Sequence, residues 1–277
     1  MLGKLIAYEF RGVWKPALII LIIMAVAGVA GSMSLATVDT LTDNYSYSFS
    51  DVTTDLSIVL TLFTLFTGFI VWAGVVGLFI VAVVRFYRTM FTDEGYLTLT
   101  LPVSTAALVM AKYLVGFVIM AAGTALAIIL YSMMLAPLTS DYGLSASTTI
   151  LAMLSGSFGF FDDQAPAAVA AGAVNAIVGI GYQLGLAYLA LTMGAWLAKR
   201  HKVAAAVGIY LGISWLLSLV FSVANVLALV GIGDYGWETV TMTTGAVSVA
   251  QMVCYAVMAA ACVALSVFLV RRKVDLI

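Results

Sequence analysis

Charged residues are scarce in this chain, because only 9% of its 277 residues are Asp, Glu, Lys or Arg. A soluble domain of ordinary composition has about 25% charged residues, which help to cover its apolar core with polar surface. Here 64% of the residues are apolar and the mean hydropathy is +1.15. The shortage of charge therefore excludes a cytosolic enzyme, a nucleic-acid-binding protein and a disordered chain.

Histidine and cysteine are also rare, with one His and two Cys in the whole chain. His201 alone cannot supply the two histidine ligands of an HExxH zinc site. Cys254 and Cys262 are eight residues apart on one predicted helix, which separates them by about 12 Å. That distance is too long for a disulfide, so we expect both to pack as small apolar residues.

Uncharged stretches fill most of the chain, and six of them are long: 16–38, 56–84, 113–140, 164–198, 203–233 and 239–270. Each exceeds the roughly 20 residues that a helix needs to cross about 30 Å of hydrocarbon. Helices are indicated because membrane β-strands would show alternating segments of about 10 residues. We therefore predict an all-α integral membrane protein with six transmembrane helices at approximately 16–36, 57–84, 104–135, 167–198, 203–230 and 245–270.

The charged residues separate by sign on the two predicted sides of the membrane. All 12 basic residues fall on one side: Lys4, Arg11, Lys15, Arg85, Arg88, Lys112, Lys199, Arg200, Lys202, Arg271, Arg272 and Lys273. Acidic residues without any basic one occupy the other side: Asp39, Asp43, Asp51, Asp55, Asp141, Asp162, Asp163, Asp234 and Glu238. The basic side is the cytoplasmic one by the positive-inside rule, so both termini are predicted to be cytoplasmic.

No ionisable residue is expected at mid-membrane depth. Lys112 lies near the start of the third predicted helix, close enough for its side chain to extend to the membrane surface. Transporters coupled to protons or sodium usually carry a carboxylate within their helices. Its absence argues against ion coupling and for another source of energy.

The chain is predicted to be a single transmembrane domain over residues 1–277. Residues 1–15 form an amphipathic leader whose polar face carries Lys4, Tyr8, Arg11 and Lys15. We expect this leader to lie on the inner membrane surface, with Pro16 in the first turn of the first transmembrane helix. The apolar run after it is too long for the core of a cleaved signal peptide. The longest outer loop, 137–165, is expected to enter the interface or to cover the outer mouth.

Several glycine motifs have simpler explanations than a catalytic site. The segment 231–236 matches GxGxxG and GxGD, but it lacks the βαβ context of a dinucleotide site and a second intramembrane Asp. Ser157 lies on the side opposite His201, so a serine protease would lack its base. The pairs Gly181/Gly185 and Gly208/Gly212 permit close helix approach, either within the bundle or between subunits.

The inner loop 85–103 has an unusual pattern for a polar linker. Residues 85–91 continue the second helix, and 92–95 break it at a glycine. Residues 96–101 alternate as an extended segment would, and Ser104 suits the N-cap of the third helix. A structured and partly apolar loop on the cytoplasmic side indicates a protein partner. The alternative is that it packs beneath its own helices.

This loop resembles the one between spans 2 and 3 of bacterial ABC-2-type transporter permeases. The resemblance lies in Phe86-Tyr87, Phe91, Asp93-Glu94-Gly95-Tyr96-Leu97 and Leu101-Pro102-Val103-Ser104, and the first 11 residues resemble that family's leader. It implies a permease subunit of an ATP-driven exporter in the bacterial cytoplasmic (inner) membrane. A second permease subunit, identical or related, and a separate ABC ATPase holding ATP and Mg would be its partners. The chain has no P-loop of its own, and we expect no catalytic, cofactor or metal site in it.

The resemblance also assigns roles to residues of the loop. It implies that the following residues contact the ATPase and couple it to the helices: Arg85, Phe86, Tyr87, Arg88, Phe91, Asp93, Glu94, Gly95 and Tyr96. In better-known relatives the outer elaboration lies between spans 5 and 6, whereas here the longest outer loop follows span 3. The alternative function is a self-contained channel or facilitator that would use neutral polar residues of the helices as a pore. The sequence does not indicate which of these residues would line it: Tyr131, Asn175, Tyr182, Gln183, Tyr188, Tyr210, Asn225, Gln251, Tyr255 and several Ser and Thr.

Overall fold

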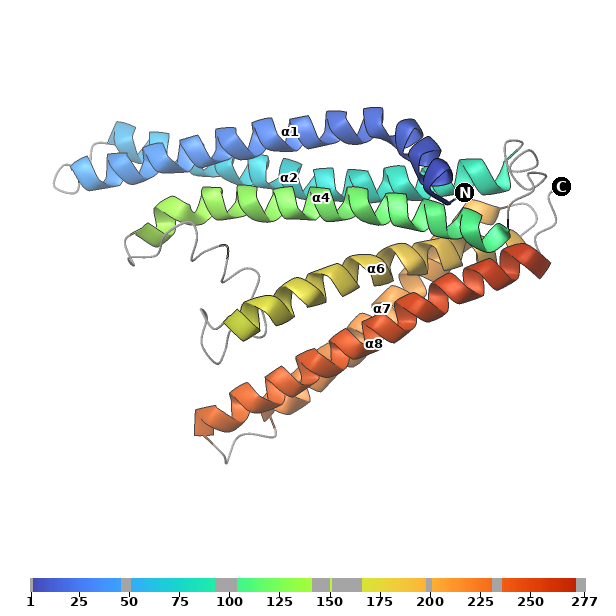
Figure 1. The fold of residues 1–277 in the computed structure, drawn as a ribbon. Coiled ribbons are helices and arrows are strands. Elements are labelled where there is room, and N and C mark those ends of the chain that lie inside the picture. The colour runs from blue at the N-terminus through green and yellow to red at the C-terminus, as the bar shows by residue number, and fades with distance from the viewer. Residues whose placement is uncertain are drawn as a thin grey trace. The chain divides into compact units, whose positions relative to one another are not determined.

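The structure is a computed structural model that describes residues 2–45, 51–92, 104–140, 150, 166–197, 201–230 and 236–272. Within these ranges the regular structure is helical, and there is no strand. Figure 1 shows the helices α1 (Leu2–Tyr45), α2 (Asp51–Phe91), α4 (Thr105–Ser140), α6 (Pro166–Leu197), α7 (Lys202–Val230) and α8 (Gly236–Arg272). All six are long and apolar enough to cross a membrane. Each predicted span therefore lies on an observed helix, and no predicted span extends more than one residue beyond the helix that contains it.

Three helices begin earlier than the sequence pattern predicts, and one of them is α2, which begins at Asp51 rather than near residue 57. The 44-residue helix α1 runs through Pro16, which was expected in the first turn of a new helix. Proline removes one N–H donor, so the carbonyl of Gly12 loses its usual helical partner while the rest of the helix continues. Helix α8 begins at Gly236 rather than near residue 245, so that Trp237 belongs to the helix.

The chain divides into two compact units, which are described separately. The first unit comprises Met1–Val13, Val81–Val118 and Ser155–Ile277, and the second comprises Trp14–Ile80 and Ile119–Leu154. In the second unit, the hydroxyls of Ser34 and Thr64 share a hydrogen bond of 2.6 Å between α1 and α2. Polar side chains in this apolar unit thus find partners on neighbouring helices.

The first unit contains the packing of α6 against α7 and α8. One apolar cluster joins α2, α4, α6 and α7 through Ala82, Phe86, Met90, Leu108, Val109, Leu184, Tyr188, Leu191 and Ala206. A second cluster joins α6 and α8 through Tyr182, Leu186, Leu189 and Cys262. The first of these clusters surrounds the site considered below.

Glycines in the first unit have different packing environments. A Cβ on Gly181 or Gly185 would contact atoms of α4 or α8, so this pair packs within the bundle. A Cβ on Gly208 or Gly212 would meet nothing within 4 Å among the described residues. At Gly194 a Cβ would lie 2.7 Å from the backbone nitrogen of Ala206, because α6 and α7 approach closely there. Of the two pairs predicted to permit close helix approach, only Gly181/Gly185 packs against another helix among the described residues.

Candidate partner-coupling site

The last turns of α2 have a buried face and an outward face. Residues three and four apart share one face of a helix. Phe86, Thr89 and Met90 are buried. The outward face, here called the α2 stripe, comprises Val84, Tyr87, Arg88 and Phe91, of which Val84 and Arg88 are exposed and the two aromatic residues half-buried. Tyr87 and Phe91 pack in part against the apolar cluster around Phe86, and the Phe91 ring lies edge to face with the Phe86 ring. The stripe therefore offers the exposed parts of two aromatic rings and one cation.

Phe86 does not belong to this outward face. The family resemblance groups it with the partner contacts, but its side chain is 0% exposed. Its ring stacks on that of Tyr188 from α6, with ring centroids 3.9 Å apart and ring planes 8° from parallel. Phe86 thus links the end of α2 to α6, and we remove it from the proposed contact surface.

Both ends of the inner loop are fixed by short hydrogen-bonded motifs. At its start, α2 ends at Phe91, and the hydroxyl of Thr92 donates to the carbonyl of Arg88. At its end, the backbone N–H of Ala107 donates to Oγ of Ser104 at 3.4 Å, which confirms Ser104 as the N-cap of α4. The predicted contact residues Asp93, Glu94, Gly95 and Tyr96 lie outside the described residues, as does the predicted extended segment after them.

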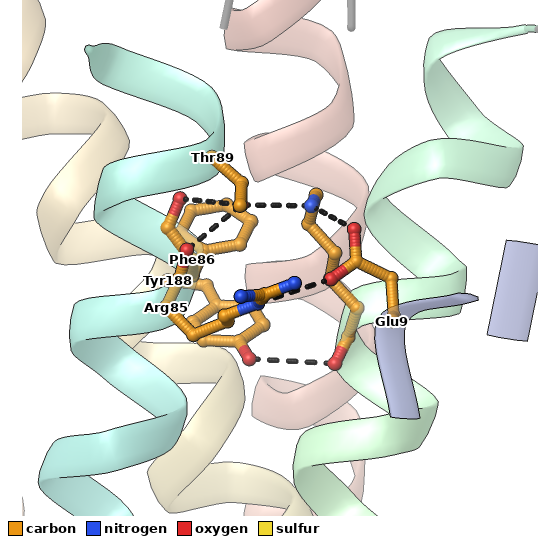
Figure 2. A network of polar contacts seen from close by, with 6 residues as sticks. Glu9, Arg85, Phe86, Thr89 and Tyr188 are labelled. Carbon is orange, nitrogen blue, oxygen red and sulfur yellow. Dashed lines mark hydrogen bonds and ion pairs between the residues drawn. The ribbon is translucent and has the colours of Figure 1, made fainter. Parts of the chain in front are cut away.

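A buried polar network, here called the Glu9 cluster, lies beside Phe86. It consists of Glu9, Arg85, Thr89, Lys112 and Tyr188 (Figure 2). Oε1 of Glu9 accepts a hydrogen bond from Nζ of Lys112, and Oε2 of Glu9 lies 3.5 Å from Nε of Arg85. Nζ of Lys112 also donates to Oγ1 of Thr89 at 2.7 Å, and the hydroxyl of Tyr188 donates to the carbonyl of Lys112 at 3.4 Å. The network joins four helices.

The position of Lys112 corrects the sequence prediction for its side chain. We predicted that it extends to the membrane surface, but the residue is only 4% exposed and turns toward Glu9. An ammonium group removed from water loses several kcal/mol of hydration free energy, so it needs a close anion and further hydrogen bonds. Glu9 and Thr89 supply both. The ion pair therefore explains how the lysine side chain can be buried among apolar helices.

Arg85 has a different environment from Lys112. Its side chain is 31% exposed, whereas that of Lys112 is 2% exposed. The Arg85 guanidinium lies against Gly12, where an added Cβ would clash with it. Its Nε is buried and has no hydrogen-bond partner among the described residues. A cavity of about 10 Å³, large enough for about one water molecule, adjoins Arg85, Glu9 and Lys112.

The members of the Glu9 cluster other than Arg85 were not identified as a group from the sequence. One signal was available, since a lysine inside an apolar run requires an acidic partner. Glu9 is the acidic residue of the otherwise basic segment 1–15. Nothing in the spacing indicates which acid a lysine will meet 103 residues away, because the pairing depends on tertiary packing.

A second polar feature lies on the exposed side of α7. A groove of about 600 Å³ is lined by Gln183, Leu211, Gly212, Ser214, Trp215 and Ser218. The hydroxyl of Tyr210 donates to Oε1 of Gln183 at 2.7 Å. Trp215 is 71% exposed, and only 6% of the most apolar window of α7 is buried. This face of α7 therefore combines neutral polar groups with an exposed apolar helix.

Other neutral polar residues pair within their own unit. The hydroxyl of Tyr131 donates to the carbonyl of Gly68 at 2.8 Å, and that of Tyr113 to the carbonyl of Gly181 at 2.9 Å. Such bonds between neutral polar groups connect neighbouring helices. Within the described residues, no group of three His, Cys, Asp or Glu side chains could hold a metal ion.

Comparison of the chain with protein-family models, with curated proteins and with solved structures gives no match.

Proposed function

We propose that this chain is the permease subunit of an ATP-driven ABC exporter in the bacterial cytoplasmic membrane. Its six helices form the translocation path, with both termini in the cytoplasm. Two such subunits, identical or related, pair with two ABC ATPase subunits that bind ATP and Mg. The observation that carries the proposal is the α2 stripe, because it presents aromatic and basic side chains at the start of the loop that resembles the coupling loop of ABC-2-type permeases.

The residue types on the stripe suit a contact with another protein. Tyr87 and Phe91 lie with ring centroids 6.0 Å apart, so they form one aromatic ridge. Aromatic and arginine side chains contribute much of the binding free energy at protein interfaces. Arg88 is exposed next to this ridge and would pair with an acidic group on the ATPase. Asp93, Glu94, Gly95 and Tyr96 would extend the contact along the loop.

The leader contributes the membrane-facing part of the proposal. Lys4, Tyr8, Arg11 and Lys15 are exposed, whereas Val13 is buried. A helix with this distribution suits the inner membrane surface, where anionic headgroups attract its basic face. In this arrangement the basic residues of the leader and of the α2 stripe are both on the cytoplasmic side.

The proposal is tested by purifying the chain from its native membranes together with any ABC ATPase that binds it. We expect a stable complex with vanadate-sensitive ATP hydrolysis in proteoliposomes. Purification of the chain alone in a stable form, with no ATPase that binds it, would contradict the proposal.

A self-contained channel or facilitator is the second candidate function, and the groove on α7 favours it. Gln183, Ser214 and Ser218 would line a polar path without any ATPase. Passive flux of small solutes through liposomes that contain only this chain would support the channel. We expect no such flux, and Gln183→Leu provides the control, because it should remove flux only if the groove conducts.

A further inference from the structure

The Glu9 cluster connects the leader to both stems of the inner loop. Arg85 lies at the end of α2, before the loop, and Lys112 lies near the start of α4, after it. One carboxylate oxygen of Glu9 faces Lys112 and the other faces Arg85. A single side chain of the leader is therefore in contact with both stems of the inner loop, namely the end of α2 and the start of α4.

We propose that Glu9 is a positioning residue for coupling, which holds the leader to both stems so that the three segments move together. In this inference, which rests on the proposed function, an ATPase that displaces the loop also displaces residues 2–13. The leader then acts as a third moving part at the membrane surface, and the loop does not move alone.

The contacts around Glu9 favour joint motion over sliding. Separating Glu9 from Lys112 would leave a buried ammonium without its anion, which is strongly unfavourable in an apolar environment. Thr89 adds a bond from Lys112 to α2, and the Phe86–Tyr188 stack holds that same turn of α2 to α6. Because packed interiors deform little, small displacements of one stem are transmitted to the other.

Gly12 is part of the same arrangement. The Arg85 guanidinium occupies the space that a side chain at residue 12 would take. The leader can therefore approach α2 closely enough for Glu9 to lie between the two cations. A side chain at residue 12, one turn after the acid, would displace the end of the Arg85 side chain, and the sequence has glycine there.

The inference is tested by distance measurements between spin labels on the full chain in complex with its ATPase. Cys254 and Cys262 are replaced by alanine, and labels are attached at Tyr8→Cys and Met110→Cys, both exposed positions outside the cluster. A second pair, at positions 110 and 215, reports movement of the α4 stem against α7. We expect ATP and vanadate to shift the second distance, while the distance from 8 to 110 stays narrow and unchanged.

Variants separate the positioning role of Glu9 from a purely structural one. Glu9→Gln should broaden the distribution from 8 to 110, but it also leaves a buried cation unpaired and can impair folding. The double variant Glu9→Gln with Lys112→Met removes both charges, so the protein should fold while the leader is released. In this double variant we expect the broadened distance together with at least a tenfold loss of vanadate-sensitive hydrolysis. Glu9→Asp should restore a narrow distribution, and Arg11→Gln is the matched control that removes an exposed leader charge.

Three results would overturn the inference. The first is a narrow distribution from 8 to 110 in the double variant, and the second is a shift of that distance by ATP and vanadate in the unmodified chain. The third is a double variant that releases the leader yet hydrolyses ATP normally. Failure of the proposed function has a different signature, because then no ATPase binds the unmodified chain or any variant.

Discussion

Truncation of Phe86 should mainly lower the stability of the chain, whereas truncation of its neighbour Tyr87 should mainly weaken binding of the ATPase. Phe86→Ala removes a ring that is 0% exposed and stacked on Tyr188. Truncation of a buried Phe to Ala lowers the free energy of unfolding by about 3–5 kcal/mol. Tyr87 is half-buried on the α2 stripe, and its truncation should lower the free energy of unfolding by only about 1 kcal/mol.

The expected effects on ATPase binding are reversed. If Tyr87 is a central contact, Tyr87→Ala should weaken the complex by about 2 kcal/mol, which is roughly 30-fold in Kd. Phe86→Ala should leave the contact surface in place, so that the fraction still folded binds the ATPase normally. Glu94→Ala removes a carboxylate that we expect to pair with the ATPase, and it should behave as Tyr87→Ala does.

Two measurements distinguish these outcomes. Thermal unfolding of the full chain in detergent reports stability, and for Phe86→Ala the midpoint should fall by on the order of 10 °C. Retention of the ATPase during purification and vanadate-sensitive hydrolysis together report coupling. If Tyr87→Ala and Glu94→Ala both bind the ATPase and support hydrolysis at the normal rate, the assignment of the stripe as the contact is wrong. An unchanged midpoint for Phe86→Ala would refute the packing argument.

Three further substitutions test other parts of the structure. Gly194→Ala should lower the free energy of unfolding by about 1–3 kcal/mol in the thermal assay, because its Cβ would meet the backbone of α7. The control Gly208→Ala should not destabilise the isolated chain, because a Cβ at residue 208 meets nothing within 4 Å among the described residues. Ser104→Ala should lower the free energy of unfolding by about 1 kcal/mol, because it removes the N-cap of α4. Ser104→Asp keeps a hydrogen-bond acceptor and should retain the stability of the unmodified chain. An equal loss of stability in both variants would argue against a cap. Gly12→Ala should displace Arg85 from Glu9 and increase hydrogen exchange of residues 2–13, and unchanged exchange would show that Arg85 contributes little to holding the leader.

The helical architecture could be predicted from the sequence because one physical requirement dominates it. A chain with long uncharged runs can satisfy its backbone in hydrocarbon by forming helices, and the spaces between charged residues set their positions. The helix ends were predicted less well, since α1 continues through Pro16 and α8 begins at Gly236. Boundaries depend on which polar residues near the membrane surface remain helical, and composition does not decide this.

The candidate site was predicted only in part. The family resemblance grouped Phe86 with Tyr87 and Phe91, and helical periodicity could not correct this because it does not tell which face of α2 is buried. The Glu9–Lys112 pair spans 103 residues and requires α1 and α4 to meet, which no local pattern specifies. The N-cap at Ser104 was correct because capping is a local interaction between a side chain and the next turn.

The central claim is that the end of α2 contacts an ATP-hydrolysing partner, and site-specific photocrosslinking in intact membranes tests it most directly. A photoreactive phenylalanine analogue replaces Phe91 on the stripe, and the matched control places it at Phe66, an exposed aromatic residue farther along the same helix. We predict that the analogue at position 91 crosslinks to a polypeptide that is also labelled by an azido derivative of ATP, and that position 66 does not. Efficient crosslinking at 91 only to this chain or to lipid, with no ATP-binding partner, would contradict the account.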